Sequence, residues 1–237
     1  MTAPHFFAPD VSGARIALAD DEARHATRVL RMRPGEEITV SDGAGNVVRA
    51  TVEKAAGLVA SVTERWTEPP GVPALHVFQA IPKTGKLDFV VQKLTELGVD
   101  VIQPFPATRS VARWDERKAA AQTQRLMAIA REAAKQSRRA WLPVVRPPVP
   151  LGSLDLPACT LVLDEEADRR VRDALPAEPP LSIGLVVGPE GGLDRDEVRG
   201  LAARGARAVT LGRLVLRTET AALAAVAVVG VRYERLG

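Results

Sequence analysis

The sequence predicts an α/β protein of 237 residues: a small β-barrel over residues 1–66, a linker over 67–73, and a parallel-sheet domain over 74–237. Three observations lead to this prediction. Short alternating runs with tight turns fill the first part, which is typical of a small barrel. Residues 67–73 (TEPPGVP) hold three prolines and a glycine, which favour a stiff linker. Beyond them strand and helix patterns alternate, as in a parallel sheet with helices on both faces.

The elements of the first part follow from local patterns. Residues 20–32 predict a short helix, because acidic residues occupy its first turn and Ala26, Val29 and Leu30 lie on one side. Pro34 and Gly35 then make a turn. Alternation predicts strands over residues 37–41, 47–52 and 58–63, and residues 42–46 (DGAGN) form a hairpin connection between the first two.

In the second part, apolar runs and helical spacing predict nine elements. Strands are expected over residues 75–81, 99–105, 160–163, 181–187 and 208–211, and helices over residues 86–97, 115–137, 194–204 and 218–233. The proline-rich residues 143–150 predict an extended connection. The longest uncharged apolar stretch, residues 220–231, is far below the roughly 20 residues that a membrane-spanning helix needs. We therefore expect a cytoplasmic protein with no membrane partner.

Composition narrows the function classes. Hydrophobic residues make up 46% and charged residues 26%, as in an ordinary globular protein. A single cysteine, Cys159, and three scattered histidines argue against a metal site, so no metal is predicted. The net charge is +3, but residues 107–146 hold ten basic and three acidic side chains. Such a patch attracts phosphates, although a solvated helix face in an arginine-rich protein would have the same composition.

Two segments stand out for chemistry, whereas G-x-G-x-x-G, Walker A and G-x-S-x-G patterns are absent. In residues 185–193 (LVVGPEGGL) a strand leads into a loop with three glycines and then a helix. Such loops bind ligands at the carboxyl edge of α/β sheets, and the alternative is a tight turn without a ligand. In residues 211–221 (LGRLVLRTETA) an apolar turn stands where a polar loop is expected. This turn could form one wall of a site for a flat aromatic ligand such as adenine. Alternatively, it could be a buried crossover with an Arg217–Glu219 ion pair.

Together the two segments resemble the SPOUT class of S-adenosylmethionine-dependent RNA methyltransferases, and most closely its 16S ribosomal RNA (uracil-N3)-methyltransferase family, RsmE. The family's G-P-E-G-G loop is residues 188–192 here, and its L-G-x-x-[IV]-L-R-T-E-T-A run is residues 211–221. Further matches follow in family order over nearly the whole chain: residues 25–35 (HATRVLRMRPG), 92–98 (QKLTELG), 109–110 (RS) and 132–137 (EAAKQS).

The resemblance implies a fold, a cofactor and partners. SPOUT domains form a deep C-terminal trefoil knot that holds S-adenosylmethionine, and the family's members are homodimers with an N-terminal PUA-like or OB-like barrel that helps to bind RNA. The expected partner is small-subunit ribosomal RNA, either free or in the assembled subunit. The implied cofactor residues are Leu163, Val187, Gly188, Pro189, Glu190, Gly191, Gly192, Leu211, Gly212, Val215, Leu216, Arg217, Thr218 and Ala221. The implied RNA contacts are Arg28, Arg31, Arg109, Ser110, Arg113, Lys135, Gln136, Arg138 and Arg139.

Two positions depart from the family pattern. The family often has Arg at the fourth position of the L-G-x-R-[IV]-L-R run, where this chain has Leu214, and its Q-S-G-R has Arg138 in place of glycine. The first departure affects a secondary contact, and the second affects how that turn meets RNA. Neither touches the glycine loop or Arg217.

The implied reaction places demands on the catalytic residues. A sulfonium methyl is already electrophilic, so catalysis is mainly positioning, but uracil N3 must lose its proton. Arg217 and Arg109 could stabilise the developing anion, and Glu219 could either accept the proton or orient Arg217. The target base must be unpaired or flipped, because N3 lies on its pairing edge. Rival readings are a SPOUT enzyme that acts on transfer RNA or a ribose 2′-hydroxyl, a non-catalytic ribosomal RNA-binding or assembly factor, and a small-molecule enzyme.

Overall fold

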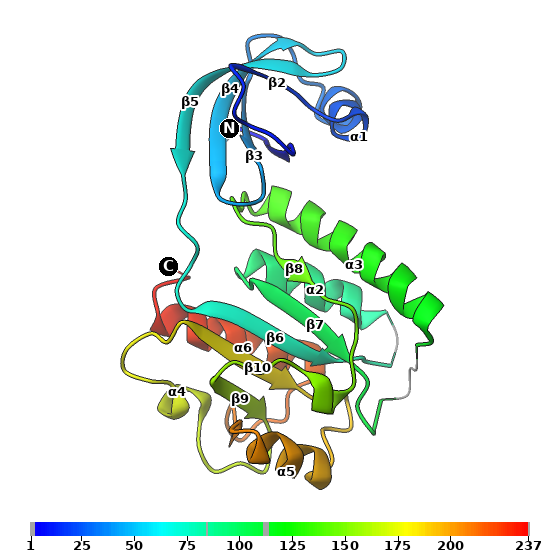
Figure 1. Cartoon of the computed structure of the whole chain (residues 1–237), viewed down its shortest axis with the longest axis vertical. Helices are drawn as coiled ribbons and strands as arrows, with labels where there is room; N and C mark the ends of the chain where they lie inside the picture. The colour runs from blue at the N-terminus through cyan, green and yellow to red at the C-terminus, as the bar shows by residue number, and fades with distance from the viewer. Residues whose placement is uncertain (1–2, 84, 111–113, 237) are drawn as a thin grey trace. The chain divides into compact units, whose positions relative to one another are not determined.

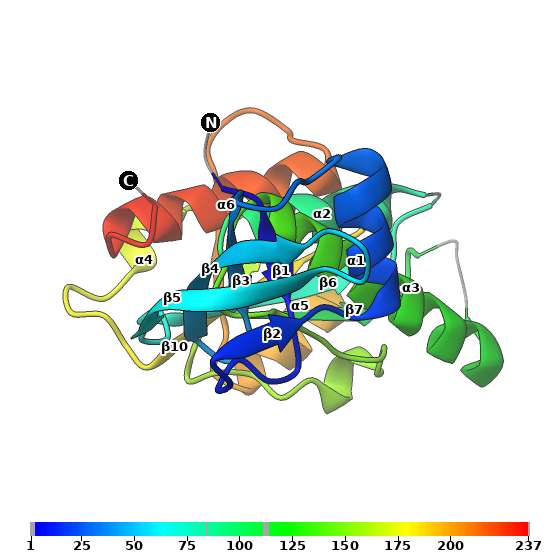
Figure 2. The same ribbon diagram turned by 90° about the horizontal axis from the view of Figure 1, so that it is seen from above.

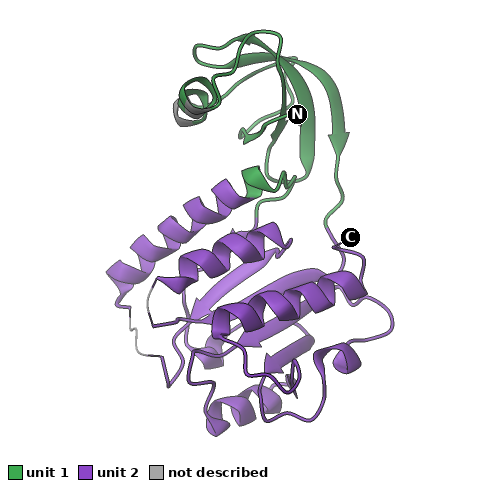
Figure 3. Ribbon diagram, turned by 180° about the vertical axis from the view of Figure 1, so that it is seen from behind, with its two compact units in different colours: residues 1–70, 134–142 green, residues 71–133, 143–237 purple. Residues whose placement is uncertain are grey.

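The computed structural model describes residues 3–83, 85–110 and 114–236. The chain divides into two compact units (Figure 3). Unit 1 comprises Met1–Pro70 and Ala134–Leu142, and unit 2 comprises Gly71–Ala133 and Pro143–Gly237. The sequence assigned residues 134–142 to the second domain, so their place in unit 1 is a difference from that expectation. The expected linker is itself divided, since the boundary falls between Pro70 and Gly71.

Unit 1 contains a curled five-stranded sheet. Its strands are β1 (His5–Phe7), β2 (Arg15–Ala17), β3 (Glu37–Ser41), β4 (Asn46–Lys54) and β5 (Val59–Thr67), in the order β1-β3-β4-β5-β2. The β1–β3 pair is parallel and the other pairs are antiparallel. Two register shifts between β4 and β5 bend the sheet, as bulges do. Within the described residues the sheet ends at β1 and β2, so it is an open half-barrel rather than a closed barrel.

The predicted helix over residues 20–32 is shorter and irregular. It consists of α1 (Asp20–Arg24) and one π-helical turn, His25–Val29. Figures 1 and 2 both place it beside the curled sheet. Ala23, Ala26 and Met32 pack there with sheet residues such as Ile38 and Val48, which makes this the core of unit 1.

Residues 134–142 join unit 1 through close packing and hydrogen bonds. A Cβ on Gly45 would lie 2.6 Å from the Trp141 ring, so this glycine leaves room for the indole. The Trp141 Nε1–H donates to the Glu68 carbonyl oxygen (2.9 Å), and the Ser41 hydroxyl donates to the Ala140 carbonyl oxygen (2.7 Å). These partners are far apart in sequence, so no local pattern could have revealed them.

Unit 2 is built on a six-stranded sheet. Its strands are β6 (Ala74–Ala80), β7 (Val101–Phe105), β8 (Val144–Val145), β9 (Cys159–Leu163), β10 (Ser182–Val187) and β11 (Arg207–Val209). The order is β11-β9-β10-β6-β7-β8, and every pair is parallel. Both the predicted strands and the predicted parallel sheet are therefore present, and the short β8 is additional.

Helices cover both faces of this sheet (Figure 1). They are α2 (Lys86–Glu96), α3 (Glu116–Gln136), α4 (Val171–Ala174), α5 (Arg195–Ala203) and α6 (Thr218–Arg232), with a 3-10 turn at Leu151–Ser153. Leu75 and Val77 of β6 pack with α2 and α6, whereas Phe78 and Ala80 of the same strand pack with Leu201 of α5. Alternate residues of one strand thus enter two cores, which explains its continuous apolar run. None of the helices in the described part of the chain is both long and apolar enough to cross a membrane.

Candidate functional site

A cleft of about 450 Å³ opens at the carboxyl ends of β9, β10 and β11. Leu163 pairs with Val209 and Val162 with Val186, so the three adjacent strands end at the same edge of the sheet. The loops that follow them form the cleft walls. This is the edge at which open α/β sheets bind ligands, and the volume lies in the range of small-molecule sites, about 300–1,000 Å³.

The cleft brings together both segments that the sequence singled out. Every residue predicted to bind the cofactor lines it, with the exception of Arg217. The residues concerned are Leu163, Val187, Gly188, Pro189, Glu190, Gly191, Gly192, Leu211, Gly212, Val215, Leu216, Thr218 and Ala221. Arg217 is the N-cap residue of α6 and is exposed beside the cleft walls formed by its neighbours Leu216 and Thr218.

The glycines of the first loop serve different purposes. A Cβ on buried Gly188 would lie 2.9 Å from the Leu193 backbone nitrogen, so the fold itself excludes a side chain there. Gly192 has a φ of +69°, in the left-handed region that favours glycine. Gly191 is exposed, and its Cβ would come no closer than 3.6 Å to Arg109. Its lack of a side chain therefore keeps the cleft open and is not required by internal packing.

Arg109, a predicted catalytic and RNA-binding residue, lies against this loop. Its Nη1–H donates to the Gly191 carbonyl oxygen (2.7 Å), and it lines the cleft. The loop is also fixed where α5 begins, because Asp194 and Glu197 form a capping box. Glu197 accepts a further hydrogen bond from the Thr108 backbone N–H (2.7 Å). The loop after β7 therefore supports the glycine loop from outside.

The second loop provides an apolar wall. Leu214 and Val215 line the cleft although they are 81% and 80% exposed, so their side chains present apolar surface to whatever enters it. Gly212 begins this loop with a φ of +128°, a conformation that favours glycine. Leu214, one of the two departures from the family pattern, thus extends the apolar wall instead of adding a charge.

The sequence analysis missed an acidic group that also lines the cleft. Asp164 follows β9 directly and accepts two hydrogen bonds from Arg195, at 2.8 and 3.0 Å. These bonds hold the pKa of Asp164 below its usual range. Glu166 also lies 3.4 Å from Arg195, and all three residues line the cleft. The available signal was the position of Asp164 at a strand's carboxyl end, like that of Gly188.

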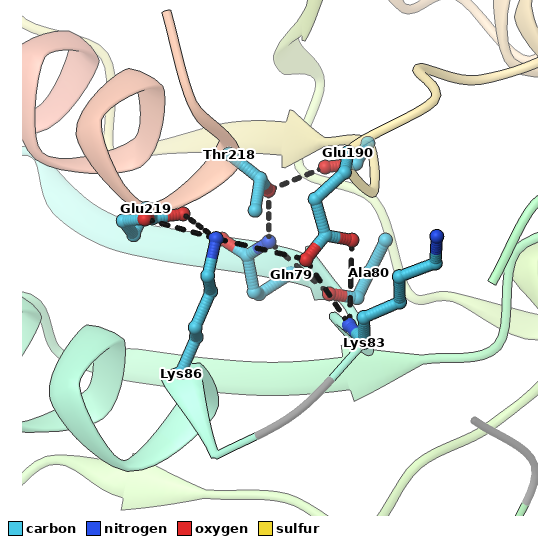
Figure 4. Close-up of polar contacts among 8 residues, drawn as sticks. Gln79, Ala80, Lys83, Lys86, Glu190, Thr218 and Glu219 are labelled. Carbon is cyan, nitrogen blue, oxygen red and sulfur yellow. Dashed lines mark hydrogen bonds and ion pairs between the residues drawn. The ribbon is translucent and has the colours of Figure 1, made fainter. Parts of the chain in front are cut away.

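Glu219, a predicted catalytic residue, is paired with a lysine (Figure 4). Its two carboxylate oxygens lie 3.1 and 3.2 Å from the Lys86 ammonium nitrogen. Burial raises the pKa of Glu219, but hydrogen bonds from its own backbone N–H and from Lys86 outweigh burial, so the pKa lies below its usual range. Glu219 is therefore a carboxylate near neutral pH.

The residues predicted to bind RNA fall in both units. Unit 2 holds Arg109 and Ser110, of which the Ser110 hydroxyl accepts a hydrogen bond from the Ala107 N–H (3.2 Å). Arg113 lies outside the described residues. Unit 1 holds Arg28, Arg31, Gln136 and Arg138, which are exposed, and Arg139, which is half-buried.

Lys135, another residue predicted to bind RNA, forms a buried ion pair. Its ammonium lies 3.0 Å from the Glu22 carboxylate, and the two side chains are 11% and 3% exposed. A buried charge needs such a partner, and this ion pair joins the end of α3 to α1 within unit 1. A sequence pattern that contains only the lysine cannot reveal this use.

Unit 2 is thus an α/β domain with a cleft at the carboxyl edge of its parallel sheet, the usual position of a ligand site, and comparisons with known proteins specify its class. The model of an RNA methyltransferase domain matches residues 69–230, and the model of an RNA methyltransferase PUA domain matches residues 18–57. These matches cover most of the chain. It therefore belongs to the RNA methyltransferase family, among relatives that are named ribosomal RNA small subunit methyltransferase E.

Individual relatives align over nearly their whole length. The chain is 41% identical to ribosomal RNA small subunit methyltransferase E of Mycobacterium bovis, over 96% of this chain and 90% of the relative. It is 31% identical to the Bacillus subtilis protein of that name, over 93% and 91%. The Neisseria gonorrhoeae protein of that name, solved bound to S-adenosyl methionine, has a TM-score of 0.87 at 32% identity and covers 98% of both chains.

Proposed function

We propose that this chain is an S-adenosylmethionine-dependent methyltransferase that methylates N3 of a uridine in small-subunit ribosomal RNA. The observation that carries the proposal is the single cleft formed by residues 188–192 and 211–221, the two segments that match the family's motifs. The relative from Neisseria gonorrhoeae supports the cofactor, and the curated names support the ribosomal substrate. The N3 position rests on the resemblance to the uracil-N3 family.

The cleft fits the proposed cofactor. The bare backbone at Gly191 allows a ligand to approach the loop closely, and Leu214, Val215 and Leu216 provide apolar surface for an adenine ring. When bound, S-adenosylmethionine supplies an electrophilic methyl group. The residues that would hold it are the cleft-lining members of the two loops together with Leu163 at the end of β9.

Arg217 and Arg109 are the proposed catalytic cations. The uracil N3 proton must leave before N3 can attack, and a fixed positive charge stabilises the resulting anion. Arg217 is exposed at the start of α6, and among the described residues its guanidinium forms no hydrogen bond or salt bridge, although its charge helps to lower the pKa of Glu219. The guanidinium is therefore available to substrate. Glu219 is an ion-paired carboxylate of lowered pKa, which makes it a weak base. We assign it to holding the start of α6 rather than to accepting the proton.

For RNA, we propose contacts by Arg109 and Ser110 in unit 2 and by Arg28, Arg31, Gln136, Arg138 and Arg139 in unit 1. Exposed arginines suit phosphate groups, and the target base must be flipped or unpaired. The trefoil knot, a homodimer and a cytoplasmic location also belong to the proposal, on the strength of the resemblance. Light scattering of the purified protein tests the dimer.

Identification of the product base tests the proposed reaction. The protein is incubated with labelled S-adenosylmethionine and unmodified ribosomal RNA, which is then digested to nucleosides. The proposal predicts label in 3-methyluridine. Label in a ribose-methylated nucleoside would keep the enzyme class but overturn the N3 assignment, and binding of the RNA without transfer would favour an assembly factor.

A further inference from the structure

Lys86 occupies an unusual position, because it lies outside both cleft motifs yet contacts both. It is the first residue of α2, and its ammonium lies 3.1 Å from a Glu219 carboxylate oxygen and 3.8 Å from one of Glu190. Glu190 belongs to the glycine loop, and Glu219 to the first turn of α6 (Figure 4). One ammonium group therefore bridges the two segments that form the cleft.

The position of Lys86 at the start of a helix is unfavourable unless nearby carboxylates compensate its charge. A positive charge at a helix N-terminus is unfavourable, because the helix dipole is positive there. The two carboxylates offset this cost, because each has an oxygen within 4 Å of the Lys86 ammonium nitrogen. The Lys86, Glu190 and Glu219 side chains are 32%, 29% and 15% exposed, so water screens these pairs only in part.

Further hydrogen bonds hold the glycine loop and the start of α6 near Lys86. Both Glu190 oxygens accept hydrogen bonds from the Lys83 backbone N–H, at 3.1 and 3.3 Å. On the buried side, the Gln79 amide donates to the Thr218 hydroxyl (2.9 Å), which donates to the Gly188 carbonyl oxygen (2.6 Å). The glycine loop and the start of α6 are thus joined at a buried neutral contact and at a half-exposed ionic one.

We propose that Lys86 is a positioning residue for methyl transfer, because its ammonium group holds the glycine loop and the start of α6 at the spacing that the cofactor requires. The inference rests on the proposed function of the cleft. Lys86 acts through Glu190 and Glu219 and does not itself line the cleft. Its removal leaves two carboxylates without their shared cation, so the loops separate and the cofactor binds less tightly.

Calorimetric binding of S-adenosylhomocysteine and steady-state kinetics on the full-length protein test this role. Lys86→Met should weaken binding and raise the KM for S-adenosylmethionine by about five-fold, the range expected for a half-buried ion pair, while the KM for RNA stays unchanged. Lys86→Arg keeps the charge and should restore affinity to within about two-fold of the wild type. Lys83→Met is the matched control, because only the backbone of Lys83 contacts Glu190 among the described residues.

A double-mutant cycle shows whether the effect passes through the loop carboxylate. Glu190→Gln in the Lys86→Met background should cost less affinity than in the wild type, because the interaction is already lost. Unchanged S-adenosylhomocysteine affinity in Lys86→Met, or a rise in the KM for RNA alone, would overturn the inference. Failure of the wild-type protein to bind S-adenosylhomocysteine would instead overturn the proposed function.

Discussion

Gly188 and Gly191 belong to one loop but are glycines for different reasons. At Gly188 a side chain would collide with the backbone of Leu193, 2.9 Å away. At Gly191 the protein itself has room for a side chain, and the open face belongs to the cleft. A residue-level comparison of the two positions therefore separates folding of the loop from ligand binding.

Gly191→Val should weaken S-adenosylhomocysteine binding by about ten-fold or more, because its branched side chain projects from the loop at the cleft. The free energy of unfolding should stay close to that of the wild type. In Gly188→Ala the main effect should instead be on stability, with the free energy of unfolding lowered by about 1–3 kcal/mol. Calorimetry and urea unfolding of both variants provide the test, and unchanged affinity in Gly191→Val would count against the assignment of the loop.

The catalytic role proposed for Arg217 can be tested by removing its side chain. Arg217→Ala should lower kcat by about a hundred-fold, the usual effect of removing one group that stabilises a transition-state charge. Affinity for S-adenosylhomocysteine should change little, because Arg217 does not line the cleft. Arg213→Ala, which removes an exposed arginine from the same loop, is the control for general loss of positive charge. Turnover close to wild type in Arg217→Ala would remove its catalytic role.

At the scale of elements, the end of α3 explains one departure from the family pattern. The Arg139 N–H donates to the Ala134 carbonyl oxygen (2.9 Å) and the Arg138 N–H to that of Lys135 (3.1 Å), which is a Schellman motif. The motif places Arg138 at a φ of +55°, in the left-handed region where the family has glycine. The sequence analysis expected this departure to affect how the turn meets RNA, and the backbone shows why glycine suits the position.

Arg138→Gly should therefore raise the free energy of unfolding by about 1 kcal/mol, because the left-handed backbone costs that much for a residue with a Cβ. The same variant should raise the KM for RNA if this exposed arginine contacts phosphate as proposed. Urea unfolding and RNA-dependent kinetics measure the two effects. A loss of stability would contradict the interpretation of the helix end.

His5 couples the sheet of unit 1 to the segment after α3. Its Nε2–H donates to the Arg139 carbonyl oxygen (3.1 Å), and its Nδ1 accepts from the Thr39 hydroxyl (2.9 Å). Burial lowers the pKa of His5 from 6.5 to about 4; the nearby charge of Arg138 adds to this, and the bond to Arg139 opposes it. The folded protein therefore keeps a neutral imidazole that the unfolded chain protonates.

The contribution of His5 to stability is fully present above pH 6.5 and is lost as the pH falls towards 4. When the pH falls from 7 to 5, the free energy of unfolding of the wild type should therefore decrease by about 2 kcal/mol more than that of His5→Gln, which lacks this titration. Urea unfolding of both proteins at the two pH values gives the difference. Equal pH dependence in the two proteins would contradict the neutral, buried state of His5.

At the scale of the whole molecule, much of unit 2 could be predicted because its signals are local. Glycine-rich and apolar turns directly after strands indicated the cleft residues, since parallel strands end at one edge. Lys86 and Gln79 gave no such signal, because their roles depend on partners in distant segments, and Asp164 offered only its position directly after β9. The place of residues 134–142 in unit 1 was not predicted for the same physical reason: the packing of Trp141 on Gly45 joins positions about 100 residues apart.

The most direct test of the central claim is transfer of labelled methyl from S-adenosylmethionine to three unmodified acceptors: small ribosomal subunits, naked small-subunit ribosomal RNA and transfer RNA. We expect label in small-subunit ribosomal RNA, free or assembled, and none in transfer RNA. Label in transfer RNA alone would contradict the substrate. No label in any acceptor, from folded protein, would contradict the proposal that this chain is an active methyltransferase.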